Sequence, residues 1–393
     1  MKSERGALSA MFVRFAESER AGGILLIGCT IVALLIANSP LGAGYHQLFE
    51  RHVVGLSVET WINDGLMAIF FLLIGLELER ELYSGELSDP RRALLPAIAA
   101  VGGMVVPAGI HFALNAGTPT VGGAGIPMAT DIAFALGVLT VLGSRVPPAL
   151  KVFVVAFAVM DDLGAIVVIA AFYTNGLAPG YLGGALGVLA LLIVMNRYLR
   201  TMALLPYLVG GLAMWYLLLR SGVHATLAGV ALAFAIPYSA KAADTASPSH
   251  RLELLLHRPV AFVILPIFAL ANTGVVIGAD WAVGLGSANS LGVMLGLTLG
   301  KPVGVAALSY LAVRSGLCRL PTEVDWAHVV GAGLLGGIGF TMSIFITNLA
   351  FGTDLATANA SKLAILVGSV AAGSAGFLWL RFVSRSAGGS RED

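Results

Sequence analysis

Two adjacent carboxylates, Asp161 and Asp162, lie in the middle of an otherwise apolar run over residues 150–172. An apolar run of about 20 residues is long enough to cross a bilayer as a helix, and acidic residues within one usually belong to an ion or proton pathway. Neighbouring carboxylates resist ionising together, which favours binding of a proton or a cation beside them. Their hard oxygen ligands suit Na⁺ or Li⁺. The pair is therefore the candidate cation- and proton-binding site, and a structural polar pair is the alternative.

Other polar residues embedded in apolar runs are expected to support this pair. Residues 125–131 (GIPMATD) contain glycine and proline, which interrupt helices. Asp131 in this stretch can neutralise the positive ends of half-helices, and Thr130 offers a hydroxyl oxygen as a cation ligand. Lys301, in a GKP motif, is the only lysine deep in an apolar run. It can pair with Asp161 or balance the negative ends of half-helices, and a purely structural ion pair is the alternative.

Four titratable residues are expected near the cytoplasmic surface. Glu77 and Glu81 close the second apolar run, and Glu253 and His257 lie where the longest cytoplasmic connection runs into a helix. Acidic residues at the cytoplasmic entrance of an ion pathway, which would form a funnel, raise the local cation concentration. Histidine titrates near neutral pH. We therefore expect these residues to contribute to a pH response, with solvated helix-end charges as the alternative.

Two further titratable residues are expected on the outer side. His224 lies at the expected start of a helix, and Asp64 lies near the outer end of the second apolar run, where it could line a vestibule. Residues without a transport role are the alternative for both.

The composition is that of a membrane protein. Of the 393 residues, 58% are hydrophobic and 11% are charged, whereas soluble domains carry about a quarter charged residues. Because only helices or closed barrels satisfy the backbone inside a bilayer, we expect an all-α polytopic membrane protein. A single transporter domain over 22–381 is expected between two tails, 1–21 and 382–393. Twelve apolar segments are the expected transmembrane helices: 22–39, 59–82, 93–114, 122–142, 149–173, 180–196, 203–219, 222–238, 259–278, 288–313, 327–351 and 361–381.

The basic residues predict the orientation of these segments. If the first segment enters from the cytoplasm, nineteen of the 23 Lys and Arg residues fall on the cytoplasmic side and three on the outer side, with Lys301 inside the membrane. This asymmetry predicts a multi-pass protein with both termini in the cytoplasm. The net charge of +1 implies no nucleic-acid partner.

An internal repeat is visible in the spacing of the segments. The regions 93–173 and 288–381 each form a group of three spans, and the middle span of each is glycine-rich, at 125–131 and at 336–341. An odd number of spans per group predicts inverted topology. Interrupted helices at matching positions of two repeats indicate the mid-membrane site of a secondary transporter. We therefore expect the fourth and eleventh spans to be interrupted, although small residues that permit close helix packing are the alternative.

Other protein classes fit the pattern less well. An intramembrane aspartyl protease needs its two aspartates on separate helices, and a cation channel favours a ring of carboxylates or carbonyls from symmetric subunits. A cation-coupled symporter for an organic solute is the serious alternative, but the interrupted regions lack a cluster of polar or aromatic groups suited to a solute. We expect a secondary active transporter rather than an enzyme, and no cofactor.

Five motifs closely resemble the NhaA family of bacterial sodium/proton antiporters, and the resemblance covers nearly the whole chain. They are ATDIAFALG at 129–137, DDLGAI at 161–166, SGVHATLAGV at 221–230, GKP at 300–302 and GIGFTMSIFI at 337–346. Because that family is itself a standard example of inverted repeats, the repeat argument is not independent of the resemblance.

The resemblance implies twelve helices, with the fourth and eleventh interrupted and crossed. It implies Asp161 and Asp162 as the cation and proton site, Asp131 as compensation for helix dipoles, and Lys301 as the partner of Asp161. It further implies an electrogenic exchanger of the bacterial inner membrane that imports more H⁺ than the Na⁺ or Li⁺ it exports. Those ions and the lipid bilayer are the expected partners, and a homodimer is left open.

The resemblance also implies activation at alkaline cytoplasmic pH, through residues that match Glu77, Glu81, Glu253 and His257. The sequence departs from the family pattern nearby: Leu254 stands where well-known members have histidine, and His250 where they have lysine. The pH profile of the family is therefore not carried over to this chain.

Overall fold

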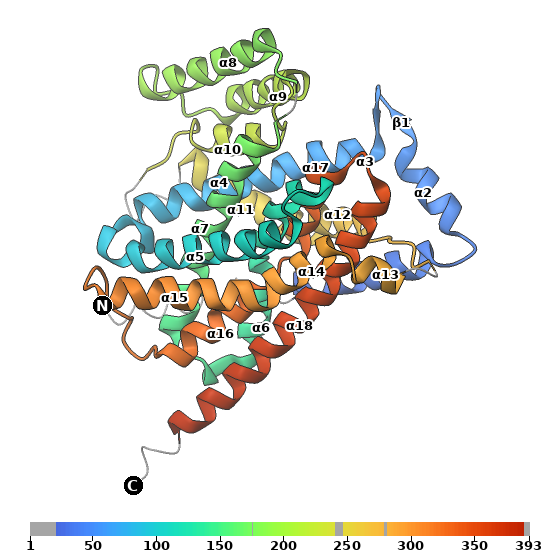
Figure 1. The fold of residues 1–393 in the computed structure, drawn as a ribbon. Coiled ribbons are helices and arrows are strands. Elements are labelled where there is room, and N and C mark those ends of the chain that lie inside the picture. Colours follow the sequence, from blue (N-terminus) through green and yellow to red (C-terminus); the bar gives the residue numbers. More distant parts are fainter. Residues whose placement is uncertain (1–20, 175, 240–246, 279–280, 389–393) are drawn as a thin grey trace. The chain divides into compact units, whose positions relative to one another are not determined.

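The computed structural model describes residues 21–174, 176–239, 247–278 and 281–388, and this part of the chain is almost entirely helical (Figure 1). Most of the N-terminal tail predicted over 1–21, and the end of the tail predicted over 382–393, lie outside the described residues. Within the described ranges, nine helices are long and apolar enough to cross a membrane, or up to eleven if two bent pairs each count as one span. The expectation of an all-α polytopic membrane protein is confirmed at this level.

The predicted segment 222–238 differs most from the structure. Only the seven-residue helix α10 (Leu227–Ala233) forms there, too short to count as a span by itself. Gly222 adopts φ 83°, in the left-handed region that glycine reaches most easily, and ends the preceding helix. Turns on both sides of α10 therefore replace the continuous helix that hydropathy alone suggested.

The chain divides into two compact units. The first comprises Met1–Ile31, Pro90–Ala165 and Val275–Asp393. It contains the start of a helix over Ala21–Ala37, most of α7, and the following elements: α5 (Pro90–Asn115), η3 (Pro119–Met128), α6 (Ile132–Leu142), η4 (Gly143–Arg145), α7 (Pro148–Phe172), α13 (Trp281–Leu285), α14 (Ala288–Leu295), η6 (Gly296–Gly300), α15 (Lys301–Arg314), α16 (Trp326–Gly336), α17 (Phe340–Phe351) and α18 (Leu355–Gly388).

Helices α5 and α15 lie side by side in this unit (Figure 1). Their backbones meet at Gly102 and Gly304: a Cβ added at Gly102 would lie 2.1 Å from the carbonyl oxygen of Gly304. Such close approach is possible only without side chains at the crossing, as is common between membrane helices.

Both glycine-rich regions of the first unit interrupt a helix. Between η3 and α6, residues Ala129 and Asp131 adopt extended conformations. Between α16 and α17, the chain bends by 48° at residues 337–339. Each interruption leaves backbone groups without their partners in a continuous helix, so other groups must satisfy them.

The second unit comprises Val32–Asp89 and Ile166–Gly274. Its elements are α2 (Gly42–Glu50), β1 (His52–Val53), β2 (Leu56–Ser57), α3 (Val58–Thr60), η1 (Trp61–Leu66), α4 (Met67–Tyr83), η2 (Glu86–Ser88), α8 (Pro179–Arg197), α9 (Leu204–Ser221), α10, α11 (Pro248–Pro259), η5 (Val260–Ile264) and α12 (Leu265–Asn272). The two strands pair antiparallel, with His52 opposite Ser57 and Val53 opposite Leu56.

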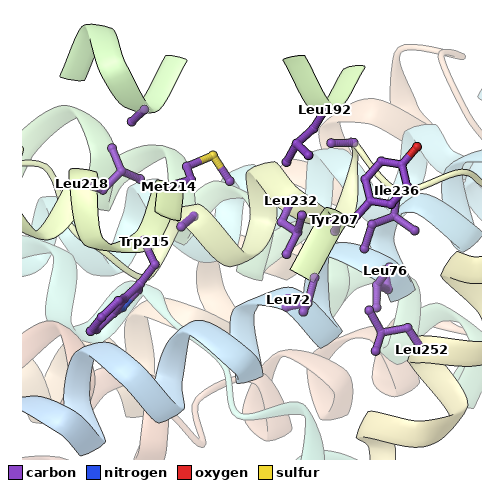
Figure 2. Close-up of a cluster of buried hydrophobic side chains, with 14 of the residues drawn as sticks. Leu72, Leu76, Leu192, Tyr207, Met214, Trp215, Leu218, Leu232, Ile236 and Leu252 are labelled. Carbon is purple, nitrogen blue, oxygen red and sulfur yellow. The ribbon is translucent and has the colours of Figure 1, made fainter. Parts of the chain in front are cut away.

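A buried apolar cluster holds the second unit together (Figure 2). Side chains from α4, α8, α9, α10 and α11 contribute to it, among them Leu76, Leu192, Tyr207 and Leu252. Trp215 stacks on Trp61 with ring centroids 5.6 Å apart, and its indole N–H donates to the backbone carbonyl of Asp64. The cluster therefore fixes α4, the helix that carries the acidic residues described below.

The glycine contact between α5 and α15 generates a prediction for stability. Gly102→Ala should destabilise the protein by about 1–3 kcal/mol, because the new methyl group must push the two backbones apart. Gly109→Ala on the same helix is the matched control, because a Cβ there meets nothing within 4 Å. The two thermal unfolding midpoints in detergent measure the difference, and equal midpoints would contradict the close contact.

Candidate cation-binding site

Asp131 lies at the interruption before α6 and caps that helix. Its Oδ1 accepts a hydrogen bond from the backbone N–H of Phe134 at 3.3 Å. An aspartate at this position satisfies one of the open backbone donors and places negative charge at the positive end of the helix. The side chain is buried, with 4% of its surface exposed. Hydrogen-bond donors of the protein must therefore largely replace water around the carboxylate.

The second interruption supplies the remaining partners of Asp131. Thr341, in the first turn of α17, donates to Asp131 Oδ2 from its backbone N–H at 3.1 Å and from its hydroxyl at 2.5 Å. Through Asp131, one carboxylate thus bridges the N-terminal ends of α6 and α17, two half-helices about 200 residues apart in sequence.

Backbone groups cross-link the same two interruptions. The Asp131 N–H donates to the carbonyl of Ile338 at 2.6 Å, and the Thr130 hydroxyl donates to the carbonyl of Gly336 at 2.8 Å. The Ser343 hydroxyl donates to the carbonyl of Ile126 at 2.7 Å. Each interruption therefore satisfies groups that the other has opened, which makes irregular backbone tolerable inside a membrane protein.

Asp161 and Lys301 form a fully buried ion pair next to this crossing. Lys301 Nζ lies 2.7 Å from Asp161 Oδ2, and both side chains are 0% exposed. Lys301 Nζ also lies 5.6 Å above the ring of Phe157, one turn before Asp161 on α7. Lys301 can reach this position because α15 begins there, directly after the π-helical segment η6.

Oxygen atoms of Asp162 and Thr130 lie near this ion pair. Asp162 is 2% exposed, and neighbours on a helix point about 100° apart. Oδ1 of Asp161 is buried and has no donor at hydrogen-bonding geometry among the described residues. Thr130 lies beside Asp161, and because its hydroxyl proton is donated to Gly336, its lone pairs are available. These oxygens suit a small hard cation better than a soft one.

The four residues expected to respond to pH lie together in the second unit. Glu77 Oε1 is 3.8 Å from His257 Nδ1, and Arg80 links the other two acids, at 3.3 Å from Glu253 and 3.2 Å from Glu81. Whether they act in pH control stays a prediction. The geometry shows that α4 and α11 present them to one another.

The sequence interpretation assigned no role to three members of this cluster, Arg80, Glu79 and His250. Glu79 is 4% exposed and accepts a hydrogen bond from the hydroxyl of Ser249 at 2.9 Å. His250 Nδ1 lies 3.7 Å from Glu253. The spacing could have indicated Glu79, because it lies between Glu77 and Glu81 at the end of an apolar helix. Its burial could not be predicted, because it depends on the packing of α11 against α4.

The two residues expected on the outer side lie apart from these clusters. Asp64 is half-buried in η1, where its backbone carbonyl accepts the hydrogen bond from Trp215. His224 is half-buried in the turn before α10, beside the backbone of Tyr173. Their suggested roles stay predictions.

Comparison with known proteins places this sequence in a family. The family model described as Na+/H+ antiporter 1 matches residues 13–380. The chain belongs to the NhaA family of sodium/proton antiporters. Membership makes it a multi-pass membrane transporter rather than an enzyme, as the resemblance of the motifs suggested.

Several relatives of the NhaA family align along nearly the entire chain. A Na(+)/H(+) antiporter NhaA from Dechloromonas aromatica is 63% identical over 98% of this chain and 99% of its own length. An NhaA from Cytophaga hutchinsonii is 55% identical over 95% of this chain and 96% of its own length. A third, NhaA 1 from Flavobacterium johnsoniae, is 53% identical over 96% and 98%, respectively.

The buried ion pair generates a prediction about coupled stability. Lys301→Gln alone should lower stability by about 3–5 kcal/mol, because it leaves the Asp161 charge buried without its partner. The double variant Lys301→Gln, Asp161→Asn should be more stable than the less stable single variant, because neither charge then remains. Thermal unfolding of all four proteins in detergent measures the coupling. Simply additive shifts would show that the two side chains do not interact.

Proposed function

We propose that the chain is an electrogenic exchanger that exports Na⁺ or Li⁺ and imports a larger number of H⁺ through Asp161 and Asp162. The observation that carries the proposal is the buried Lys301–Asp161 pair, 2.7 Å apart, beside a second carboxylate and the hydroxyl oxygen of Thr130. Family membership supports Na⁺ and H⁺ as the exchanged ions. The buried oxygens support Asp161, Asp162 and Thr130 as the cation ligands.

Charge balance suggests how binding is coupled to protons. With Lys301 charged and both carboxylates ionised, the site carries one net negative charge, which one Na⁺ or one proton neutralises. Exchange of that proton for Na⁺ moves no net charge. More H⁺ than Na⁺ therefore crosses only if a second group also releases its proton when Na⁺ binds. Lys301 is suited to this role, because Na⁺ competes with its ammonium group for Asp161.

The interruptions suggest how the site is reached from either side. We assign the chain twelve transmembrane helices with inverted repeats over about 93–173 and 288–381, in which the fourth and eleventh spans are the interrupted ones. In that arrangement Asp131 compensates the half-helix ends, and movement of the half-helices exposes the site alternately. The basic residues support a location in the bacterial inner membrane with both termini in the cytoplasm.

The cluster on α4 and α11 supports regulation by pH. Glu77 lies against His257, and Glu81 and Glu253 both lie against Arg80. Histidine is the side chain best suited to change its charge near neutral pH. We assign the cluster a modulating role: it shifts the pH profile, and protonation of the carboxylates at the site remains the main source of pH dependence.

Transport by a charge-removing variant tests the proposal. Asp162→Asn should reduce Na⁺-driven proton efflux to background, because it deletes both a cation ligand and a proton carrier. Glu50→Gln is a matched control, since it removes an exposed carboxylate outside both the site and the α4–α11 cluster and should keep the maximal rate. The measurement is the dequenching of a pH-sensitive dye in proteoliposomes when Na⁺, Li⁺ or K⁺ is added. Exchange in Asp162→Asn at the rate of the unmodified protein would reject the assignment.

A further inference from the structure

An apolar groove that Asp161, Asp162 and Lys301 do not line lies in the first unit. It has a volume of about 550 Å³ and lies between the helix Ala21–Ala37, α6 and α18. Its lining includes Gly23, Gly137 and Gly373, which have no side chains to fill it. The other lining residues are aliphatic or aromatic, except Ser374. The three helices that form it belong to segments long and apolar enough to span a membrane.

The rims of the groove are open to the surroundings of the protein. Ile24 is 61% exposed, Val141 is 56% exposed and Leu378 is 49% exposed. On a membrane-spanning segment such side chains face hydrocarbon rather than water. An apolar groove between them therefore fits an acyl chain, which gains contacts there that a flat helix surface does not offer.

One end of the groove carries positive charge. Arg145, in η4, follows Val141 of the groove by four residues, and Arg381 follows Leu378 by three residues on α18. The elements η4 and α18 contact each other. Neither arginine has an ion-pair partner among the described residues. The sequence places no Asp or Glu in 21–37, 132–145 or 355–388.

We propose that this groove binds one anionic phospholipid, with an acyl chain between the three helices and the phosphate group between Arg145 and Arg381. Basic pockets between transmembrane helices on the cytoplasmic side are suited to anionic headgroups, and the positive-inside pattern assigns both arginines to that side. The charge at the groove's end selects an anionic lipid over a zwitterionic one.

The lipid would touch a turn that the cation site depends on. Phe134 lines the groove, and its backbone N–H is the donor that Asp131 Oδ1 accepts. Its ring packs edge-on against Phe340, with centroids 4.9 Å apart, directly before Thr341. A bound acyl chain thus packs against the half-helix that Asp131 caps and should stabilise it.

Lipid binding to the full-length protein in detergent tests the proposal independently of transport. The purified, delipidated protein is titrated with phosphatidylglycerol or phosphatidylcholine, and bound lipids are counted by native mass spectrometry. The unmodified protein should bind one phosphatidylglycerol more tightly than phosphatidylcholine. The double variant Arg145→Gln, Arg381→Gln should weaken phosphatidylglycerol binding by about tenfold or more.

A second variant fills the groove without changing its charge. A Cβ at Gly137 meets nothing within 4 Å, so Gly137→Leu can place its side chain in the groove and should abolish the tight binding. Gly109→Leu is the matched control, because it adds the same side chain to an open position on α5 and should bind lipid normally. The thermal unfolding midpoint of each variant shows that it is folded.

Four results would overturn the proposal. The first is equal affinity for the two lipids, and the second is unchanged phosphatidylglycerol binding in Gly137→Leu. The third is tight binding that appears only after residues 2–20 are deleted, which would make the N-terminal segment the occupant of the groove. Conversion of a dimer to a monomer by Gly137→Leu would likewise overturn it, because the groove would then be an interface between two copies.

Discussion

The central physical constraint is the burial of charge at the pair Lys301–Asp161. Both side chains are completely shielded from solvent, and unbalanced charge in such an environment is costly. One positive group and two carboxylates leave the site one charge short of neutrality, so a proton or a cation is required. Under the proposed function, a neutral residue in place of Asp162 would leave Lys301 and Asp161 balanced, so no positive charge would be missing and no cation or proton would be required. Under the proposed function, this missing positive charge makes Na⁺ and H⁺ alternatives at the site, and Lys301 supplies the further proton that electrogenic exchange requires.

The interrupted helices are the second condition for this site. Breaking a helix opens donors and acceptors that a bilayer does not satisfy. Here the two interruptions satisfy each other: Asp131 receives both hydrogen bonds from Thr341, and the carbonyls of Gly336 and Ile338 are used by residues of the other break. Each set of bonds connects two half-helices, and Thr130, which takes part in one of them, lies beside Asp161. The glycine contact between α5 and α15 brings the backbone of the helix that carries Lys301 against α5.

Much of this site was predictable, because charged residues in apolar runs are rare and conspicuous. The sequence singled out Thr130, Asp131, Asp161, Asp162 and Lys301, which the structure buries in the first unit, and their role in transport stays a prediction. The NhaA family was predicted correctly. The Asp131–Thr341 bonds were not predictable, because they join segments that are distant in sequence. Glu79 was missed because its burial depends on α11. The segment 222–238 is as apolar as a transmembrane span. Hydropathy carries no information on backbone conformation, so it did not reveal that Gly222 ends one helix and that turns flank the next.

The dependence of exchange rate on Na⁺ concentration at several pH values is the most direct test of competition between Na⁺ and H⁺ for the carboxylates. Below the apparent pKa of the site, the account predicts that apparent Na⁺ affinity weakens about tenfold per pH unit for each competing proton, while saturating Na⁺ restores the full rate. His257→Ala should shift this profile by up to about one unit. A maximal rate that falls at acid pH in the unmodified protein, and becomes independent of pH in His257→Ala, would contradict the account and make the α4–α11 cluster the sensor.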